Sequence, residues 1–178
     1  MLEDRILLWK TKRGDKSAFD TLYDRYVDTL LTIGRNLLGN ADEAEEVVQD
    51  VFASFVESLA SFELRGSLKG FLAICVANRA RDALRKRSRV ASTEYEAPPK
   101  RVSEPLELMI RSEQIDRLQQ ALAELPAEQR EIIVLKVHAG LSFRVMAREL
   151  GMALGTVQNR FRYGIDRLRR SLNGEVTE

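Results

Sequence analysis

Two stretches of the sequence concentrate side chains that bind polyanions. The first, RARDALRKRSR at residues 79–89, holds six basic residues opposed by Asp82 alone, in a chain of 178 residues with a formal net charge of +1. The second, residues 142–170, carries seven arginines against Glu149 and Asp166. The net charge of the whole chain is close to zero, but two segments are strongly cationic. This distribution of charge indicates phosphate contacts at two separate places.

The second stretch has the spacing of a helix-turn-helix. LSFRVMARELGMALGTVQNRFRYGIDRLRRSL predicts a helix over about 142–150, a turn, and another helix over about 155–172. Ala147 is small where the two helices would cross, and Gly151 can adopt the positive φ of a sharp turn. Val157 would point back into the angle between the helices. A basic helical hairpin is more often a solvated surface, but these three positions favour the DNA-binding motif.

The second helix of such a motif enters the major groove, with its first turns against base edges. Asn and Gln can pair bidentately with adenine, and Arg with guanine. The candidate base-reading residues are therefore Thr156, Gln158, Asn159, Arg162 and Tyr163. Arg144 and Arg160 are assigned to phosphate contacts or to bracing of the motif.

The first stretch ends a segment in which aromatic and basic residues alternate. FELRGSLKGFLAICVANRARDALRKRSR predicts a loop over 62–66, then a helix capped at Ser67 with an apolar first half and a basic end. An aromatic pocket for an extruded base, beside arginines that follow the backbone, suits unpaired DNA. Phe62 and Phe71 are the nearby rings and Asn78 could bind a base edge. The two rings could equally be core residues.

Acidic residues gather upstream, near the start of another predicted helix. ADEAEEVVQDVF carries five carboxylates at the first turns and on one side of that helix: Asp42, Glu43, Glu45, Glu46 and Asp50. A solvated first turn, favoured by the helix dipole, accounts for most of this pattern. An acidic face beside Val47, Val48 and Val51 also suits docking onto a basic helix of another protein.

Helical periodicity extends over nearly the whole chain, and no convincing strand pattern occurs. Gly39, Gly140 and Gly151 mark helix ends. The sequence therefore predicts an all-α protein of two small helical domains, the C-terminal one a helix-turn-helix. The expected bounds are 1–88 and 105–178, joined by a flexible, proline-containing linker over 89–104. About 16 linker residues would span roughly 20 to 25 Å.

Composition argues against several classes of protein. Cys75 is the one cysteine, so no intrachain disulfide is possible, which fits a reducing compartment. No apolar run approaches the roughly 18 residues of a membrane span, so we expect a soluble, cytoplasmic protein without membrane insertion. Cys75 and the one histidine, His138, fall in different predicted domains. We therefore expect no catalysis, no metal site and no cofactor.

Taken together and in this order, the segments resemble the extracytoplasmic-function (ECF) sigma factors, promoter-specificity subunits of bacterial RNA polymerase in the sigma-70 family. The likeness covers nearly the whole chain. DEAEEVVQDVF looks like the core-binding region, GSLKGFLAICVANRARDALRKRSR like the minus-ten element, and LPAEQREIIVLKVHAGLSFRVMARELGMALGTVQNRFRYGIDRLRR like the minus-thirty-five reader. The resemblance implies a non-enzymatic factor that binds core polymerase and directs promoter-specific initiation.

The resemblance also implies three sets of site residues. Docking on the clamp helices of the polymerase beta-prime subunit would use Asp42, Glu45, Glu46, Gln49 and Asp50. Minus-ten recognition and melting, with the 62–67 loop capturing a flipped base, would use Phe62, Arg65, Ser67, Phe71, Asn78, Arg79, Arg81 and Arg85. Minus-thirty-five recognition would use Arg144, Thr156, Gln158, Asn159, Arg160, Arg162 and Tyr163. The polymerase beta flap and an anti-sigma factor are further implied partners.

The chain departs from the family pattern in both DNA-reading segments. Phe71 stands where Trp is frequent, which would weaken stacking there. The recognition helix has Gln158-Asn159-Arg160 in place of a frequent Lys-Ser-Arg, and Tyr163 in place of Arg, which predicts an atypical minus-thirty-five element. The alternative is a sigma-like module that titrates an anti-sigma factor without reading promoters. Such a module would have eroded basic helices, whereas both are strongly basic here.

Overall fold

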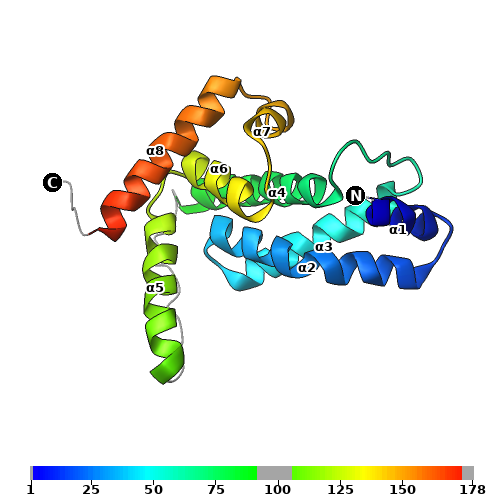
Figure 1. Cartoon of the computed structure of the whole chain (residues 1–178), viewed down its shortest axis with the longest axis horizontal. Helices are drawn as coiled ribbons and strands as arrows, with labels where there is room; N and C mark the ends of the chain where they lie inside the picture. Colours follow the sequence, from blue (N-terminus) through cyan, green and yellow to red (C-terminus); the bar gives the residue numbers. More distant parts are fainter. Residues whose placement is uncertain (1, 92–105, 174–178) are drawn as a thin grey trace.

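The computed structural model describes the backbone of residues 2–91 and 106–173 and the side chains of 2–89 and 115–173. The described residues form eight helices and no strand, which confirms the all-α class (Figure 1). The helices are α1 (Leu2–Lys12), α2 (Lys16–Leu38), α3 (Ala41–Ser58), α4 (Leu68–Ala91), α5 (Leu106–Ala123), α6 (Ala127–His138), α7 (Phe143–Glu149) and α8 (Leu154–Leu172). Most of the predicted linker lies outside the described residues.

Local side-chain bonds set several of the helix ends. Asn40 caps α3, because its side-chain oxygen accepts hydrogen bonds from the amides of Asp42 and Glu43. Ser67 and Ser142 cap α4 and α7 in the same way, as their sequence positions predicted. The three glycines expected at helix ends, Gly39, Gly140 and Gly151, all have positive φ. These caps fix where each functional segment begins.

A buried carboxylate holds α1 on α2. Asp4 is buried and accepts hydrogen bonds from the Tyr26 hydroxyl at 2.7 Å and the Arg25 guanidinium at 2.9 Å. Burial, together with the bond to Asp4, raises the pKa of Tyr26 to about 12. Glu3 and Asp4, the two acidic partners of Arg25, lie on the side of α1 that faces α2. The opposite side of α1 faces the solvent.

The second half packs α5 and α8 around α6. A small apolar cluster joins α5, α6 and the end of α8, formed by Ala121, Leu122, Leu125, Ile133 and Leu168. Helix α8 crosses α6 at Gly164, where an added β-carbon would lie 2.6 Å from Cδ1 of Ile133. Such a close crossing positions α8 tightly on its support.

The two halves share one hydrophobic core rather than standing apart. Buried side chains of α2, α3 and α4 form one continuous cluster with Ile132, Leu135, Met146 and Val157 of the second half. Helix α6 packs on α2 and α4, with α7 and α8 beyond it and α5 projecting away (Figure 1). At the start of α4, a β-carbon on Gly70 would lie 2.7 Å from Cδ2 of Leu141. We call this contact region between the halves the seam.

We predict that Gly164→Ala has a free energy of unfolding about 1 to 3 kcal/mol lower than a matched Gly→Ala change elsewhere in α8, because the added methyl must displace Ile133. The matched control is Gly155→Ala on the same helix, where no atom lies within 4 Å of the added carbon. It should leave stability unchanged or raise it by up to about 1 kcal/mol, because alanine favours helix. Urea unfolding followed by circular dichroism compares the two variants, and equal stabilities would contradict the close crossing.

Candidate polymerase and promoter interfaces

Helices α7 and α8 form the predicted helix-turn-helix. Ala147 and Val157 are buried at the crossing, and Gly151 adopts a φ of 65° in the turn between the helices. The Met152 amide donates a hydrogen bond of 2.8 Å to the Ala147 carbonyl, which closes the turn. Ala147, Gly151 and Val157 therefore have the positions in the crossing and the turn that their sequence spacing predicted.

The outer face of α8 leaves the predicted base-reading residues exposed: Thr156, Gln158, Asn159, Arg162 and Tyr163. Arg162 lies against the Tyr163 ring, with its guanidinium carbon 5.0 Å from the ring centroid. Arg144 of α7 is exposed, whereas Arg160 is half-buried and directs Nη1 at the Met152 sulfur, 3.0 Å away. Arg160 thus braces the motif, which is one of its two expected roles.

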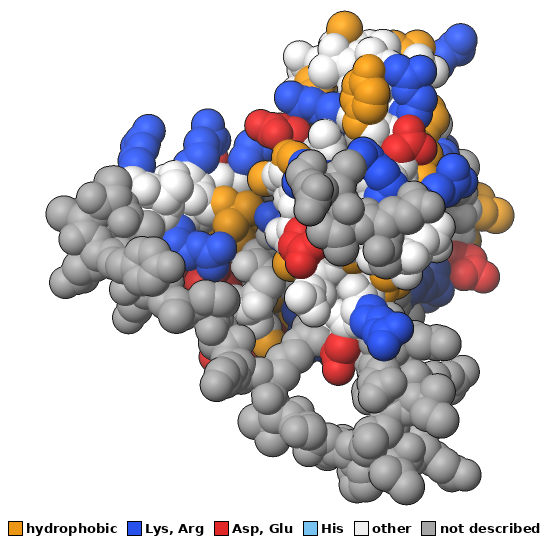
Figure 2. Space-filling model, turned by 90° about the vertical axis from the view of Figure 1, so that its left-hand side faces the viewer, with side chains coloured by type: hydrophobic (Ala, Val, Ile, Leu, Met, Phe, Trp, Pro, Cys, Tyr) orange, Lys and Arg blue, Asp and Glu red, His pale blue; other side chains and the backbone are white. Residues whose placement is uncertain are grey.

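Figure 2 shows the face of the molecule that lies on the left-hand side of Figure 1, where α8 ends. Lys and Arg side chains lie along the upper and left-hand parts of that face, with fewer acidic side chains between them. The face is therefore cationic without being uniformly so. A surface of this kind attracts phosphates and loses affinity as salt rises.

The loop between α3 and α4 carries an aromatic cluster. The Phe62 ring lies 5.2 Å from that of Phe55 and 4.8 Å from that of Phe71, measured between centroids. Phe55 is buried, but Phe62 is half-buried and Phe71 is 38% exposed. Phe55 therefore belongs to the core, whereas Phe62 and Phe71 form part of the wall of an open pocket.

That pocket faces the second half of the protein. Its volume is 990 Å³, and its walls come from the 58–71 segment on one side and from Leu141, Val145, Arg148 and Glu149 on the other. Arg65 and Ser67, both exposed, belong to the loop wall. A flipped base could enter the loop pocket, but α7 and the residues before it line the same space.

The later turns of α4 hold four predicted DNA-binding residues, three of them engaged in ion pairs. Asn78 is exposed, and Arg79 contacts α3 through Asp50 at 3.2 Å and through Ser54. Arg85 pairs with Asp82 of its own helix. The fourth residue, Arg81, pairs across the seam with a carboxylate of α6.

The carboxylate that receives Arg81 is Glu131, which sequence reasoning missed. Glu131 is only 6% exposed, and burial raises its pKa although Arg81 and Arg160 oppose that rise. A carboxylate directly before the apolar run IIVL was the one available signal, because a charge on the buried side of a helix requires a partner. Arg81 supplies that partner from the other half of the chain.

The acidic side of α3 is exposed, as a docking surface requires. Asp42, Glu45, Glu46, Gln49 and Asp50 all face solvent, and Glu45 is loosely paired with Arg35 at 3.5 Å. The three neighbouring valines, Val47, Val48 and Val51, are buried in the protein's own core. These valines hold α3 onto α2 and α4, so the acidic side chains and Gln49 form the outer side of these turns of the helix.

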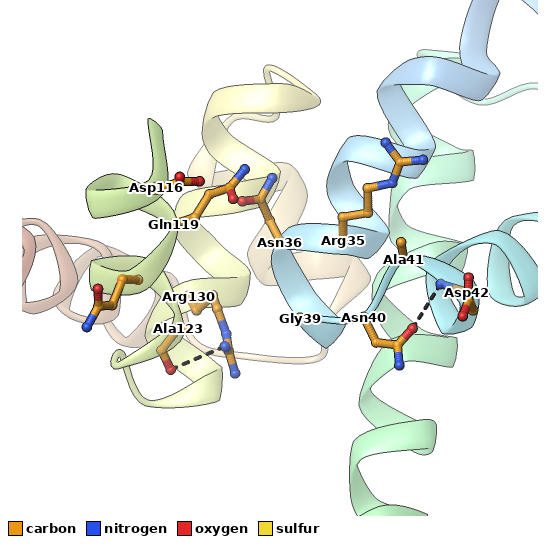
Figure 3. A pocket seen from close by; sticks show the side chains of 11 residues that line it. Arg35, Asn36, Gly39, Asn40, Ala41, Asp42, Asp116, Gln119, Ala123 and Arg130 are labelled. Carbon is orange, nitrogen blue, oxygen red and sulfur yellow. Dashed lines mark hydrogen bonds between the residues drawn. The ribbon is translucent and has the colours of Figure 1, made fainter. Parts of the chain in front are cut away.

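A second cavity follows the seam beside this acidic surface. It measures 610 Å³ and lies where the α2–α3 turn faces α5 and α6 (Figure 3). The Asn40 side chain turns toward the Asp42 amide on one side, and Arg130 turns toward the Ala123 carbonyl on the other. The acidic surface of α3 thus begins at the edge of the seam.

Comparisons with known proteins identify both halves. Sigma-70 region 2 matches residues 22–90, and Sigma-70 region 4 matches residues 115–168. The chain is 28% identical to the ECF RNA polymerase sigma factor SigW of Bacillus subtilis, over 97% of each chain. It is 31% identical to the ECF RNA polymerase sigma factor SigM of Mycobacterium tuberculosis, over 95% of this chain and 84% of that protein.

Solved structures agree with these relatives. The sigma factor RpoE, crystallised with the anti-sigma factor NepR from Bartonella quintana, aligns with a TM-score of 0.72 at 26% identity, over 87% of this chain and 96% of that chain. CnrH, in complex with the cytosolic domain of CnrY, has a TM-score of 0.72 at 23% identity, over 98% and 99% of the two chains, and supports the fold. The chain therefore belongs to the ECF RNA polymerase sigma factors, members of the sigma-70 family that direct promoter-specific initiation of transcription.

Proposed function

We propose that three surfaces of this sigma factor divide the work of initiation. The acidic side of α3 docks on the clamp helices of the beta-prime subunit, and the second half contacts the beta flap. The 62–67 loop and α4 bind the opened minus-ten strand, while the first turns of α8 read the minus-thirty-five duplex. The observation that carries the proposal is the separation of two cationic surfaces, one beside an aromatic pocket and one on a recognition helix.

The chemistry of each surface supports its assignment. Unpaired bases stack on rings such as Phe62 and Phe71, whereas the amide side chains of Gln158 and Asn159 match base edges in a closed groove. Burial raises the pKa of the Cys75 thiol, which is the opposite of what an activated nucleophile needs. No cluster of His, Cys, Asp or Glu among the described residues could hold a metal ion. Because the relatives are sigma factors, we infer a binding factor without catalysis of its own, acting in the cytoplasm.

Promoter binding requires the seam to open. The two promoter elements lie about two helical turns apart, or roughly 70 Å, and two halves that share one core cannot reach both. In the closed form Arg81 is also held by Glu131 instead of a phosphate. We infer that core polymerase and promoter DNA pull the halves apart. An anti-sigma factor, the kind of partner bound to RpoE in its co-crystal, would hold them inactive.

Run-off transcription with core polymerase and a panel of promoters tests the function directly. We expect promoter-specific transcripts that depend on the chain. Core association without transcripts from any promoter would instead favour a module that only titrates an anti-sigma factor, while loss of core association as well would refute the polymerase-binding role.

In the recognition helix, replacing Gln158 and Asn159 with alanine should change which minus-thirty-five base is preferred, at about 1 to 3 kcal/mol per lost contact. Arg144→Ala removes an exposed charge and should weaken all sites alike, reducing the slope of log affinity against log salt by about one unit. Binding to a library of promoter duplexes measures both effects. Identical profiles for the two variants would contradict this division between base and phosphate contacts.

Across the seam, Arg81→Ala should open the free protein, because it leaves the buried Glu131 carboxylate without its partner. The raised pKa of Glu131 determines how the opening depends on pH. A carboxyl whose pKa is raised in the closed form stabilises that form at pH values below its unfolded pKa, and this stabilisation is lost as pH rises through the folded pKa. The opening should therefore be largest at neutral pH and reverse on acidification. Small-angle X-ray scattering reports it as an increase in the radius of gyration.

Two further variants control this experiment. Arg85→Ala removes a charge one turn later that pairs within α4, and it should leave the halves closed. Arg81→Met combined with Glu131→Leu replaces the ion pair with apolar groups and should restore closure. A radius of gyration that does not change in Arg81→Ala at neutral pH would show that the ion pair does not hold the seam.

A further inference from the structure

The solvent side of α1 exposes an apolar stripe that none of the three proposed surfaces uses. Leu2, Ile6 and Trp9 follow one another at i, i+4 and i+7, so they lie on one face of the helix. Trp9 is the one tryptophan of the chain and is 58% exposed. Buried Leu8 and Asp4 hold the other face of α1 on the rest of the protein.

This face of α1 is also cationic. The guanidinium carbon of Arg13 lies over the Trp9 ring, 4.7 Å from its centroid, which fixes the arginine beside the ring. Arg5 and Lys10 are exposed on the same helix and form no salt bridge within the described part of the chain. The carboxylates of α1 are directed toward α2 instead, where they pair with Arg25. An indole surrounded by unpaired cations is complementary to a ligand that offers both flat rings and negative charge.

The end of α1 is attached to the 62–67 loop. Lys12 Nζ donates a hydrogen bond of 2.5 Å to the Phe62 carbonyl, 50 residues later in the chain. Trp9 lies one helical turn before Lys12, and α1 lies next to the 59–67 connection in Figure 1. The exposed indole therefore lies one helical turn from the point where α1 contacts the 62–67 loop.

We propose that Trp9 and Arg13 form a second single-strand contact, in which an unpaired base near the captured one stacks on the indole and Arg13 binds the adjacent backbone. This inference rests on the proposed role of the loop in the minus-ten complex. Aromatic rings flanked by basic groups bind single strands because every base has a flat π-face, whereas a duplex hides these faces in its own stack. The contact would extend the path of the opened strand from Phe62 across the end of α1.

The test uses the full chain with core polymerase on a template opened in advance at the minus-ten region, taken from a promoter that is active in run-off transcription. The lifetime of the complex after a heparin challenge measures the grip on the opened strand. Trp9→Ala should shorten this lifetime by about five- to tenfold, the lower part of the range for one stacked base, because Arg13 already covers one face of the ring. Trp9→Phe should keep most of the lifetime. Arg5→Ala, an exposed charge on the same helix, should have a smaller effect.

A double-mutant cycle locates the contact. Abasic sites are placed one at a time along the opened strand, in complexes of the original chain, Trp9→Ala and Phe62→Ala. One abasic position should lose its effect in Trp9→Ala, and a different, nearby position should lose its effect in Phe62→Ala.

The outcomes separate this inference from the proposed function on which it rests. If Phe62 couples to one position and Trp9 to none, the loop assignment stands and the α1 contact is overturned. If neither residue couples to any position, the minus-ten assignment itself fails. If Trp9→Ala leaves the lifetime unchanged but weakens binding to core polymerase, the face is a protein-docking surface and the inference is wrong.

Discussion

The ion pair between Arg81 and Glu131 joins two halves that we propose act on separate promoter elements. Glu131 is buried in α6, where a carboxylate is costly unless a cation reaches it, and the cation comes from the basic end of α4. The surrounding core, from Leu22 and Ile33 to Ile132 and Val157, is continuous across the seam. In the free protein the two halves are consequently packed against each other and do not stand as separate domains.

This closed state gives the same side chains two sets of partners. Arg79 and Arg81 pair with carboxylates in the free protein, although their charge and position suit phosphates of an opened strand. The loop pocket, in turn, is shared between an aromatic wall and the segment around α7. On the proposed function, Arg79 and Arg81 are held by carboxylates in the free protein and become available to DNA on the polymerase. The outer face of α8 is exposed in the free protein.

Much of the fold follows from local signals. The caps at Ser67 and Ser142, the turn at Gly151 and the burial of Val157 depend on residues a few positions apart, and the sequence predicts each of them. The seam was not predicted, because the sequence does not show which buried charge meets which across 50 residues. For a related reason the sequence does not identify the partner of the α3 valines: an apolar stripe indicates burial but not whether the partner is the protein's own core or another protein.

We propose that the halves are closed in the free protein and separate on the promoter. Spin labels on exposed residues of the two halves, at Glu57 and Arg167 with Cys75 replaced by serine, measure this distance by pulsed electron paramagnetic resonance. One short distance in the free chain should give way to a much longer one in the complex with core polymerase and promoter DNA. The same short distance in both samples would contradict the account.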